Sequence, residues 1–128
     1  MKYEFGLEIA TRHGIPVIVM RGDITAESDA GIKTAWAEAV LSSAETVAFD
    51  FTQTKYINSA GVATLLSIVT RAVGQSRKVL FVGLTAHFRK VVDLIGMTDF
   101  VQVAESVDEW ASECCPGPHQ PGKDSNPQ

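Results

Sequence analysis

The fold is decided by residues 47–66, which read VAFDFTQTKYINSAGVATLL. Val47–Phe51 is an apolar and aromatic run, which is typical of a buried strand. The mostly polar residues 52–56 that follow are predicted to form a loop. Apolar residues then recur at helical spacing, which predicts a helix that begins near Ser59 and ends near Gly74 as its C-cap. A strand that leads into a helix is the first half of a βαβ unit.

Strand and helix signals alternate on both sides of this stretch. An alternating apolar and polar run at residues 3–9 and a β-branched apolar run at 15–20 flank a short turn at residues 11–14, which predicts an antiparallel hairpin. Strands are expected at residues 3–9, 15–20, 47–51, 78–83 and 100–103, and helices at 25–41, 59–74, 85–95 and 106–111. This order predicts an α/β fold with a mixed sheet of about four to five strands, an N-terminal hairpin and about four helices packed on the sheet. Trp36 and Trp110 are expected in the core.

The composition is that of an ordinary globular domain. The chain has 128 residues, of which 45 % are hydrophobic and 20 % are charged. This length is enough for one domain with its own core, and the composition excludes a coiled coil or a collagen-like fibre. Lys and Arg number 11 and Asp and Glu number 15, so the net charge is −4. An acidic chain is poorly suited to bind the phosphate backbone of nucleic acid or an anionic membrane surface.

The composition changes after Ala111. Residues 112–128 contain four of the five prolines and almost no large apolar residue, which predicts a domain at 1–111 and a disordered tail at 112–128. Within this tail, Cys114 and Cys115 are adjacent, too close for an unstrained disulfide, so two reduced thiols are expected.

The sequence has no signal for secretion, membrane insertion or metal binding. It lacks the apolar run of a signal peptide and any membrane-spanning stretch, which predicts a cytoplasmic protein. His13, His87 and His119 have no metal-ligand spacing, so neither a metal nor a cofactor is expected.

Ser59 lies at the N-terminus of the predicted helix, where the first backbone N–H groups lack partners. Its simplest interpretation is an N-cap, worth about 1 kcal/mol. Gly61 is unexpected in the first turn, because Gly costs about 1 kcal/mol relative to Ala within a helix. We interpret the missing side chain as leaving the surface beside Ser59 open to a closely approaching partner.

The loop Asn58-Ser59-Ala60-Gly61 and the small and aliphatic residues after it resemble the signature of the STAS domain (sulphate transporter and anti-sigma factor antagonist). The segment is most similar to the stand-alone bacterial anti-sigma factor antagonists. The resemblance extends over residues 3–111 and includes Gly22-Asp23-Ile24 and the segment 89–97. It implies a STAS-like version of the α/β fold.

The resemblance also implies a function. The unmodified protein would bind an anti-sigma factor that is itself an ATP-dependent serine kinase, and would thereby release a sigma factor. Phosphorylation of Ser59 by that kinase would end the complex, and a PP2C-type phosphatase would reset it. The chain would be a binding module and a kinase substrate, not an enzyme. The implied partner surface consists of Asn58, Ser59, Ala60, Gly61 and Thr64, with Asp23, Thr52, Thr54 and Lys55 as further contacts.

The loop departs from the family pattern at two positions. Asn58 replaces the usual acidic residue, which keeps the shape and hydrogen bonding but removes the charge. Ala60 replaces a second hydroxyl, so Ser59 is the single candidate acceptor in the loop.

Three alternatives remain open from the sequence. Some STAS-like proteins are subunits of lipid-transport ATP-binding cassettes. In these, the same face binds an ATPase, and no cycle of phosphorylation and dephosphorylation is needed. Others are scaffold domains of stress-signalling assemblies. A hydrolase built on Asp50 and Ser59 is the third alternative, but no His lies near the motif and no Gly-x-Ser-x-Gly elbow exists.

Overall fold

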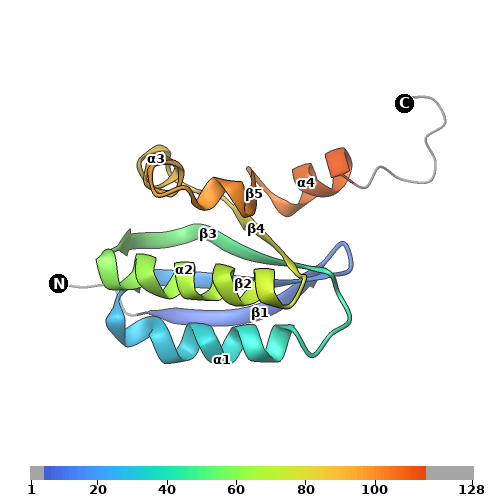
Figure 1. The fold of residues 1–128 in the computed structure, drawn as a ribbon, viewed down its shortest axis with the longest axis horizontal. Helices are drawn as coiled ribbons and strands as arrows, with labels where there is room; N and C mark the ends of the chain where they lie inside the picture. The colour runs from blue at the N-terminus through green and yellow to red at the C-terminus, as the bar shows by residue number, and fades with distance from the viewer. Residues whose placement is uncertain (1–4, 115–128) are drawn as a thin grey trace.

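The computed structural model describes residues 5–114, which form one mixed sheet with helices on both faces (Figure 1). The strands are β1 (Gly6–Arg12), β2 (Ile15–Ile24), β3 (Thr46–Ile57), β4 (Lys78–Val82) and β5 (Val101–Ala104). Their order in the sheet is the order of the sequence, β1-β2-β3-β4-β5. Strand β1 is antiparallel to β2, and every later pair is parallel. The predicted hairpin and mixed sheet are confirmed.

The hairpin turn is tighter than the sequence predicted. Strand β1 extends to Arg12 and β2 begins at Ile15, so only His13 and Gly14 form the turn. Both residues have positive φ, 52° and 79°. This is the conformation that a two-residue hairpin requires to match the twist of its strands. The turn therefore occupies two residues instead of the expected four.

Strand β3 is much longer than predicted. Its pairing with β4 ends at Asp50, but it continues beside β2 as far as Ile57. The prediction of a loop at residues 52–56 was wrong, because this extension has only one neighbouring strand and therefore keeps polar, exposed side chains. The extension carries the chain directly from the sheet to the start of the second helix.

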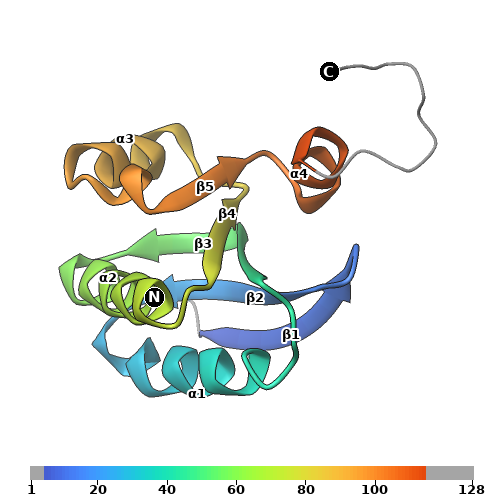
Figure 2. The same cartoon turned by 45° about the vertical axis from the view of Figure 1, so that its right-hand side comes forward.

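The helices are α1 (Asp29–Ala39), α2 (Ser59–Gly74), α3 (Ala86–Leu94) and α4 (Val107–Cys114), with short 3-10 turns at Ala26–Ser28 and Met97–Asp99. Side chains of α1, α2 and α3 share one core with the sheet, and α4 packs on the opposite face (Figures 1 and 2).

Both tryptophans lie in the core, as predicted. Trp36 of α1 is completely buried and stacks on Phe49 of β3, with ring centroids 6.2 Å apart. Trp110 of α4 packs with Leu80 on the other face, and its indole N–H donates a 2.8 Å hydrogen bond to Gln102. These contacts hold one layer of helix against each face of the sheet.

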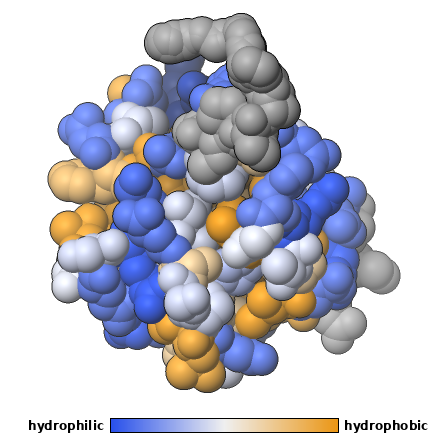
Figure 3. All heavy atoms as spheres, turned by 90° about the vertical axis from the view of Figure 1, so that its right-hand side faces the viewer, coloured by the Kyte–Doolittle hydropathy of each residue, from blue (hydrophilic) through white to orange (hydrophobic). Residues whose placement is uncertain are grey.

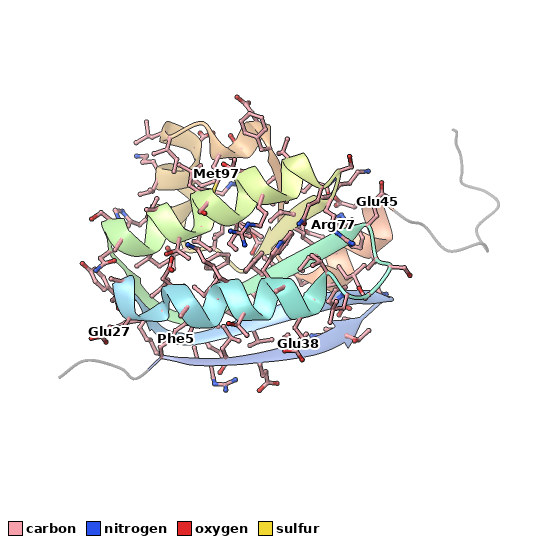
Figure 4. The ribbon with its side chains drawn as sticks, turned by 60° about the horizontal axis from the view of Figure 1, so that its bottom comes forward. Phe5, Glu27, Glu38, Glu45, Arg77 and Met97 are labelled. Carbon is pink, nitrogen blue, oxygen red and sulfur yellow. The ribbon has the colours of Figure 1, made fainter. Side chains whose placement is uncertain are left out.

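Arg77 joins the end of α1 to the start of β4 (Figure 4). Its guanidinium donates hydrogen bonds to the backbone carbonyls of Val40 and Ala44. The carbonyl of Glu45 accepts a 2.8 Å bond from the N–H of Lys78.

Helix α2 does not end with Gly74 as its C-cap, which corrects the prediction. Gln75 is the C-cap, and Ser76 takes the positive φ of 57°.

Candidate functional site

Asn58, not Ser59, caps helix α2. The Asn58 side-chain oxygen accepts a 2.9 Å hydrogen bond from the Gly61 N–H, and its backbone N–H donates to the Ile24 carbonyl at 3.2 Å. The Asn58 carbonyl accepts the first intrahelical bond, from Val62 at 3.0 Å. The interpretation of Ser59 as the N-cap was therefore wrong: Ser59 is the first residue inside the helix.

The Ser59 side chain is exposed, and its hydroxyl is available for reaction. Within residues 5–114, no group forms a hydrogen bond with its hydroxyl, because Asn58 already performs the capping. Ser59 also lies at the N-terminus of a 16-residue helix, where the macrodipole is positive. The N–H groups of Ser59 and Ala60 precede the first intrahelical bond. The position presents a hydroxyl to solvent at a point that favours an added negative charge.

Replacing Asn58 by alanine should lower the free energy of unfolding by about 1 kcal/mol, because the capping bond to Gly61 is lost. Asn58→Asp is the matched control, since it keeps the capping oxygen and adds a charge that the helix N-terminus favours. Urea unfolding of the three proteins measures the effect. Equal stability of Asn58→Ala and the unaltered protein would contradict the assignment of the cap.

Gly61 faces the interior of the protein. A Cβ on this residue would lie 2.5 Å from the Ile24 carbonyl oxygen and 3.0 Å from Cγ2 of Ile57. Gly61 is buried, so the interpretation that it opens the surface to a partner is corrected. Its lack of a side chain instead lets the first turn of α2 rest directly on the ends of β2 and β3.

Thr64 is also turned inward. It is 4 % exposed, and its hydroxyl lies 2.6 Å from an Asp29 carboxylate oxygen at the start of α1. This hydrogen bond, assisted by Lys33 at 3.3 Å, holds the pKa of Asp29 below its ordinary value. Thr64 therefore ties α2 to α1 and influences the surface only through the position of the helix.

Asp23 lies near Asn58 at the same end of the sheet. Asp23 is opposite Tyr56 in the β2–β3 register, and the next pair is Ile24 with Ile57. The Asp23 side chain is half-buried, and its Oδ1 has no hydrogen-bond partner within residues 5–114. The fold thus brings a carboxylate that is distant in sequence to the end of the sheet where α2 begins.

The other three residues predicted as further contacts lie along the β3 extension. Thr52 is exposed, and both its N–H and its hydroxyl donate to the carboxylate of Asp50. The half-buried Thr54 donates its hydroxyl to the Met20 carbonyl at 3.2 Å. Lys55, the third, is exposed. Thr52 and Thr54 are therefore engaged with their own sheet.

A groove of about 160 Å³ lies between the β3 extension, the start of α2 and α3. Its lining is mainly apolar and aromatic, and comprises Phe51, Thr54, Lys55, Tyr56, Ile57, Val62, Thr85, His87, Phe88 and Val91. This groove was not predicted from the sequence, because residues 52–56, which form one wall as a strand, were predicted to be a loop. The sequence signal was Tyr56, an aromatic residue at the end of a polar stretch three positions before Ser59, and the structure leaves it 57 % exposed.

At the end of the sheet that carries the hairpin turn and α4, hydrophilic residues surround separate hydrophobic ones (Figure 3). Along helix α2, no residue from Ser59 to Thr70 carries a charge. Residues 5–114 contain no group of three or more His, Cys, Asp or Glu placed to hold a metal ion. The same residues include no helix with the length and apolarity needed to cross a membrane.

The chain is similar to known proteins both in its sequence pattern and in its fold. Residues 6–110 match the family model of the STAS domain. An anti-sigma factor antagonist from Mycobacterium paratuberculosis superposes with a TM-score of 0.72 at 15 % identity, covering 86 % of this chain and 93 % of that one. The Bacillus protein SpoIIAA in its phosphorylated form gives 0.63 at 20 % identity, with 87 % and 99 % covered. Its unphosphorylated form gives 0.65 at 19 %, with 89 % and 99 % covered.

No curated protein matches the sequence. The solved structures are too distant in sequence to carry more than the fold, but the family match extends over most of the chain and includes Asn58, Ser59 and the whole of α2. The strand order and the N-terminal hairpin agree with the shared fold. The chain belongs to the STAS domain family.

Proposed function

We propose that this protein is an anti-sigma factor antagonist whose binding is switched off by phosphorylation of Ser59. The observation that carries the proposal is the exposed Ser59 hydroxyl. It is not used for capping, because the Asn58 side chain caps the helix. A kinase can reach this hydroxyl without first breaking a hydrogen bond within residues 5–114. Distant structural neighbours described as anti-sigma factor antagonists support the proposal.

The chemistry of the position suits a switch that acts at an interface. A phosphoserine carries a charge of about −1.5 to −2 at neutral pH. The N-terminus of α2 favours such an anion, so the modified domain stays folded. The same charge pressed against a partner without a counterion costs several kcal/mol. Phosphorylation would therefore end binding without unfolding the protein.

The proposed contact surface centres on Asn58, Ser59 and Ala60. From there it continues along the uncharged, exposed side of α2, which includes Ala63 and Leu66. Lys55, Tyr56 and Asp23 lie at its rim, at the end of the β2–β3 pair. Gly61 and Thr64 contribute from beneath the surface, by fixing where α2 lies.

The proposed partner is an anti-sigma factor with ATP-dependent serine kinase activity, and a PP2C-type phosphatase would restore Ser59. The protein would act in the cytoplasm, by protein contacts alone, without touching nucleic acid or membrane. Its net charge of −4 is consistent with a partner that is not a polyanion.

A pull-down from lysate of the native host with Mg-ATP tests the proposal. The bait is compared with its Ser59→Glu variant, and captured proteins are identified by mass spectrometry. Capture of a serine-kinase anti-sigma factor by the unaltered bait alone, with phosphate mapped to Ser59, is the expected result. Capture of a transporter ATPase by both baits would overturn it and favour the lipid-transport alternative.

A further inference from the structure

Strand β1 leaves one edge of the sheet without a partner among residues 5–114. It is seven residues long, whereas β5 at the opposite edge has four. An open strand of this length presents a row of unpaired N–H and C=O groups, which readily pair with another strand. Of the seven side chains, only Glu8 and Arg12 are charged.

The hairpin determines which backbone groups point outward. In a two-residue hairpin, the pair that flanks the turn exchanges both backbone hydrogen bonds, and here that pair is Arg12 and Ile15. Because hydrogen-bonding direction alternates along a strand, the N–H and C=O groups of Leu7, Ile9 and Thr11 point away from β2. These groups are the ones that a further strand would use.

Opposite charges favour one register for two copies of β1 paired antiparallel about a two-fold axis. With Ile9 opposite Thr11 of the second copy, Ala10 lies on the axis and Glu8 faces Arg12 of the second copy twice. Moving the axis to Glu8 would place two like charges opposite each other, which is destabilising. The favoured register also pairs Ile9 and Thr11 through their outward-facing backbone groups.

The neighbouring charges extend these pairs into a chain of alternating sign. Glu8 already lies 3.0 Å from Arg21 within its own copy, and Arg12 lies 3.7 Å from Asp108. All four side chains are between 40 % and 64 % exposed, so they remain accessible to a second copy. In the paired register, Glu8 would lie between two arginines and Arg12 between two carboxylates.

The groove beside the edge is suited to the same partner. It runs between β1 and α1. Half-buried Leu7 and Ile9 line it, together with small residues of the helix and two glutamates: Ala30, Gly31, Thr34, Ala35, Glu8 and Glu38. Figure 4 shows Glu38 and Phe5 along this side of the molecule. Small side chains let the α1 helices of two copies approach each other when their β1 strands join.

We propose that the protein forms a two-fold dimer through β1, with Glu8 of each copy paired with Arg12 of the other. The dimer continues the sheet across the axis and covers the groove between β1 and α1. Strand β2 separates β1 from β3, so the surface around Ser59 stays open in both copies. The proposal does not rest on the function proposed above.

Sedimentation equilibrium of the full chain tests this interface. The unaltered protein should dimerise, and Glu8→Arg or Arg12→Glu alone should weaken the dimer by about tenfold or more, because each reverses two cross-strand pairs. The double variant should recover dimerisation. Arg21→Ala is the control, since it removes the contact within one copy and leaves the proposed pairs intact. Circular dichroism checks that each variant is folded.

The register is tested by cross-linking in a Cys114→Ser, Cys115→Ser background. Ala10→Cys should form an intermolecular disulfide, because position 10 faces position 10 of the second copy at the close, non-hydrogen-bonded spacing. Thr11→Cys, which faces Ile9, should form none. A monomer at every concentration, or a disulfide at Thr11→Cys and not at Ala10→Cys, would overturn the proposal.

Discussion

Replacing Ser59 by glutamate is expected to weaken binding to the anti-sigma factor at least about a hundredfold while the domain stays folded. The glutamate carboxylate would stand at the start of a helix stretch, residues 59–70, that carries no charge, and would lose its hydration in the complex. A penalty of about 3 kcal/mol or more corresponds to that loss of affinity. Within the isolated domain, the same carboxylate lies at the positive end of α2 and is tolerated.

Ser59→Gln is the matched control for charge, because glutamine has the size of glutamate and is neutral. Titration calorimetry of the partner with the unaltered protein, Ser59→Ala, Ser59→Gln and Ser59→Glu separates the two causes. The glutamine variant should lose much less affinity than the glutamate variant. Equal losses for both would show that bulk, and not charge, disrupts the complex, and would count against the phosphorylation switch.

Replacing Gly61 by alanine should lower the free energy of unfolding by about 1–3 kcal/mol, although alanine is the better helix former by about 1 kcal/mol. The added Cβ would lie 2.5 Å from the carbonyl oxygen of Ile24. That carbonyl cannot move away freely, because it accepts the N–H of Asn58 at 3.2 Å. The start of α2 must shift outward, and Ser59 shifts with it.

Gly74→Ala is the control for this substitution. Gly74 is the last residue of the same helix, and a Cβ there would meet nothing within 4 Å. This variant should be unchanged or more stable by up to about 1 kcal/mol. Thermal and urea unfolding measure both variants, and partner affinity reports the displacement of Ser59. A Gly61→Ala protein as stable as Gly74→Ala would refute the close approach of α2 to β2.

Much of the fold could be predicted because its elements have strong local signals. The alternation in β1, the apolar run at Val47–Phe51 and the helical spacing around Leu65 each indicate one type of structure. The β3 extension was missed because a strand with one neighbour and exposed side chains has the polar composition of a loop. Only the pairing with β2, which is not local in sequence, identifies it as a strand.

In the candidate site, too, features with local signals could be predicted and features that depend on tertiary contacts could not. Ser59 could be located from the loop and the helix start, but the roles of its neighbours depend on tertiary contacts. Asn58 and Ser59 are both acceptable capping residues, and the sequence does not say which of them caps. Gly61 could be recognised as unusual, yet its reason, the carbonyl of Ile24, lies 37 positions earlier in the chain. The α3 side of the groove depends on the packing of Phe88 and Val91 against the core, which is not local in sequence.

The strand order also has a consequence for biosynthesis. Because β1 to β5 lie side by side in the order in which the ribosome makes them, each strand can join an edge that already exists when it emerges. No strand has to enter between two others that have already paired, and loop closure never spans more than one crossover. The domain can therefore assemble vectorially, beginning with the hairpin whose two-residue turn closes fastest.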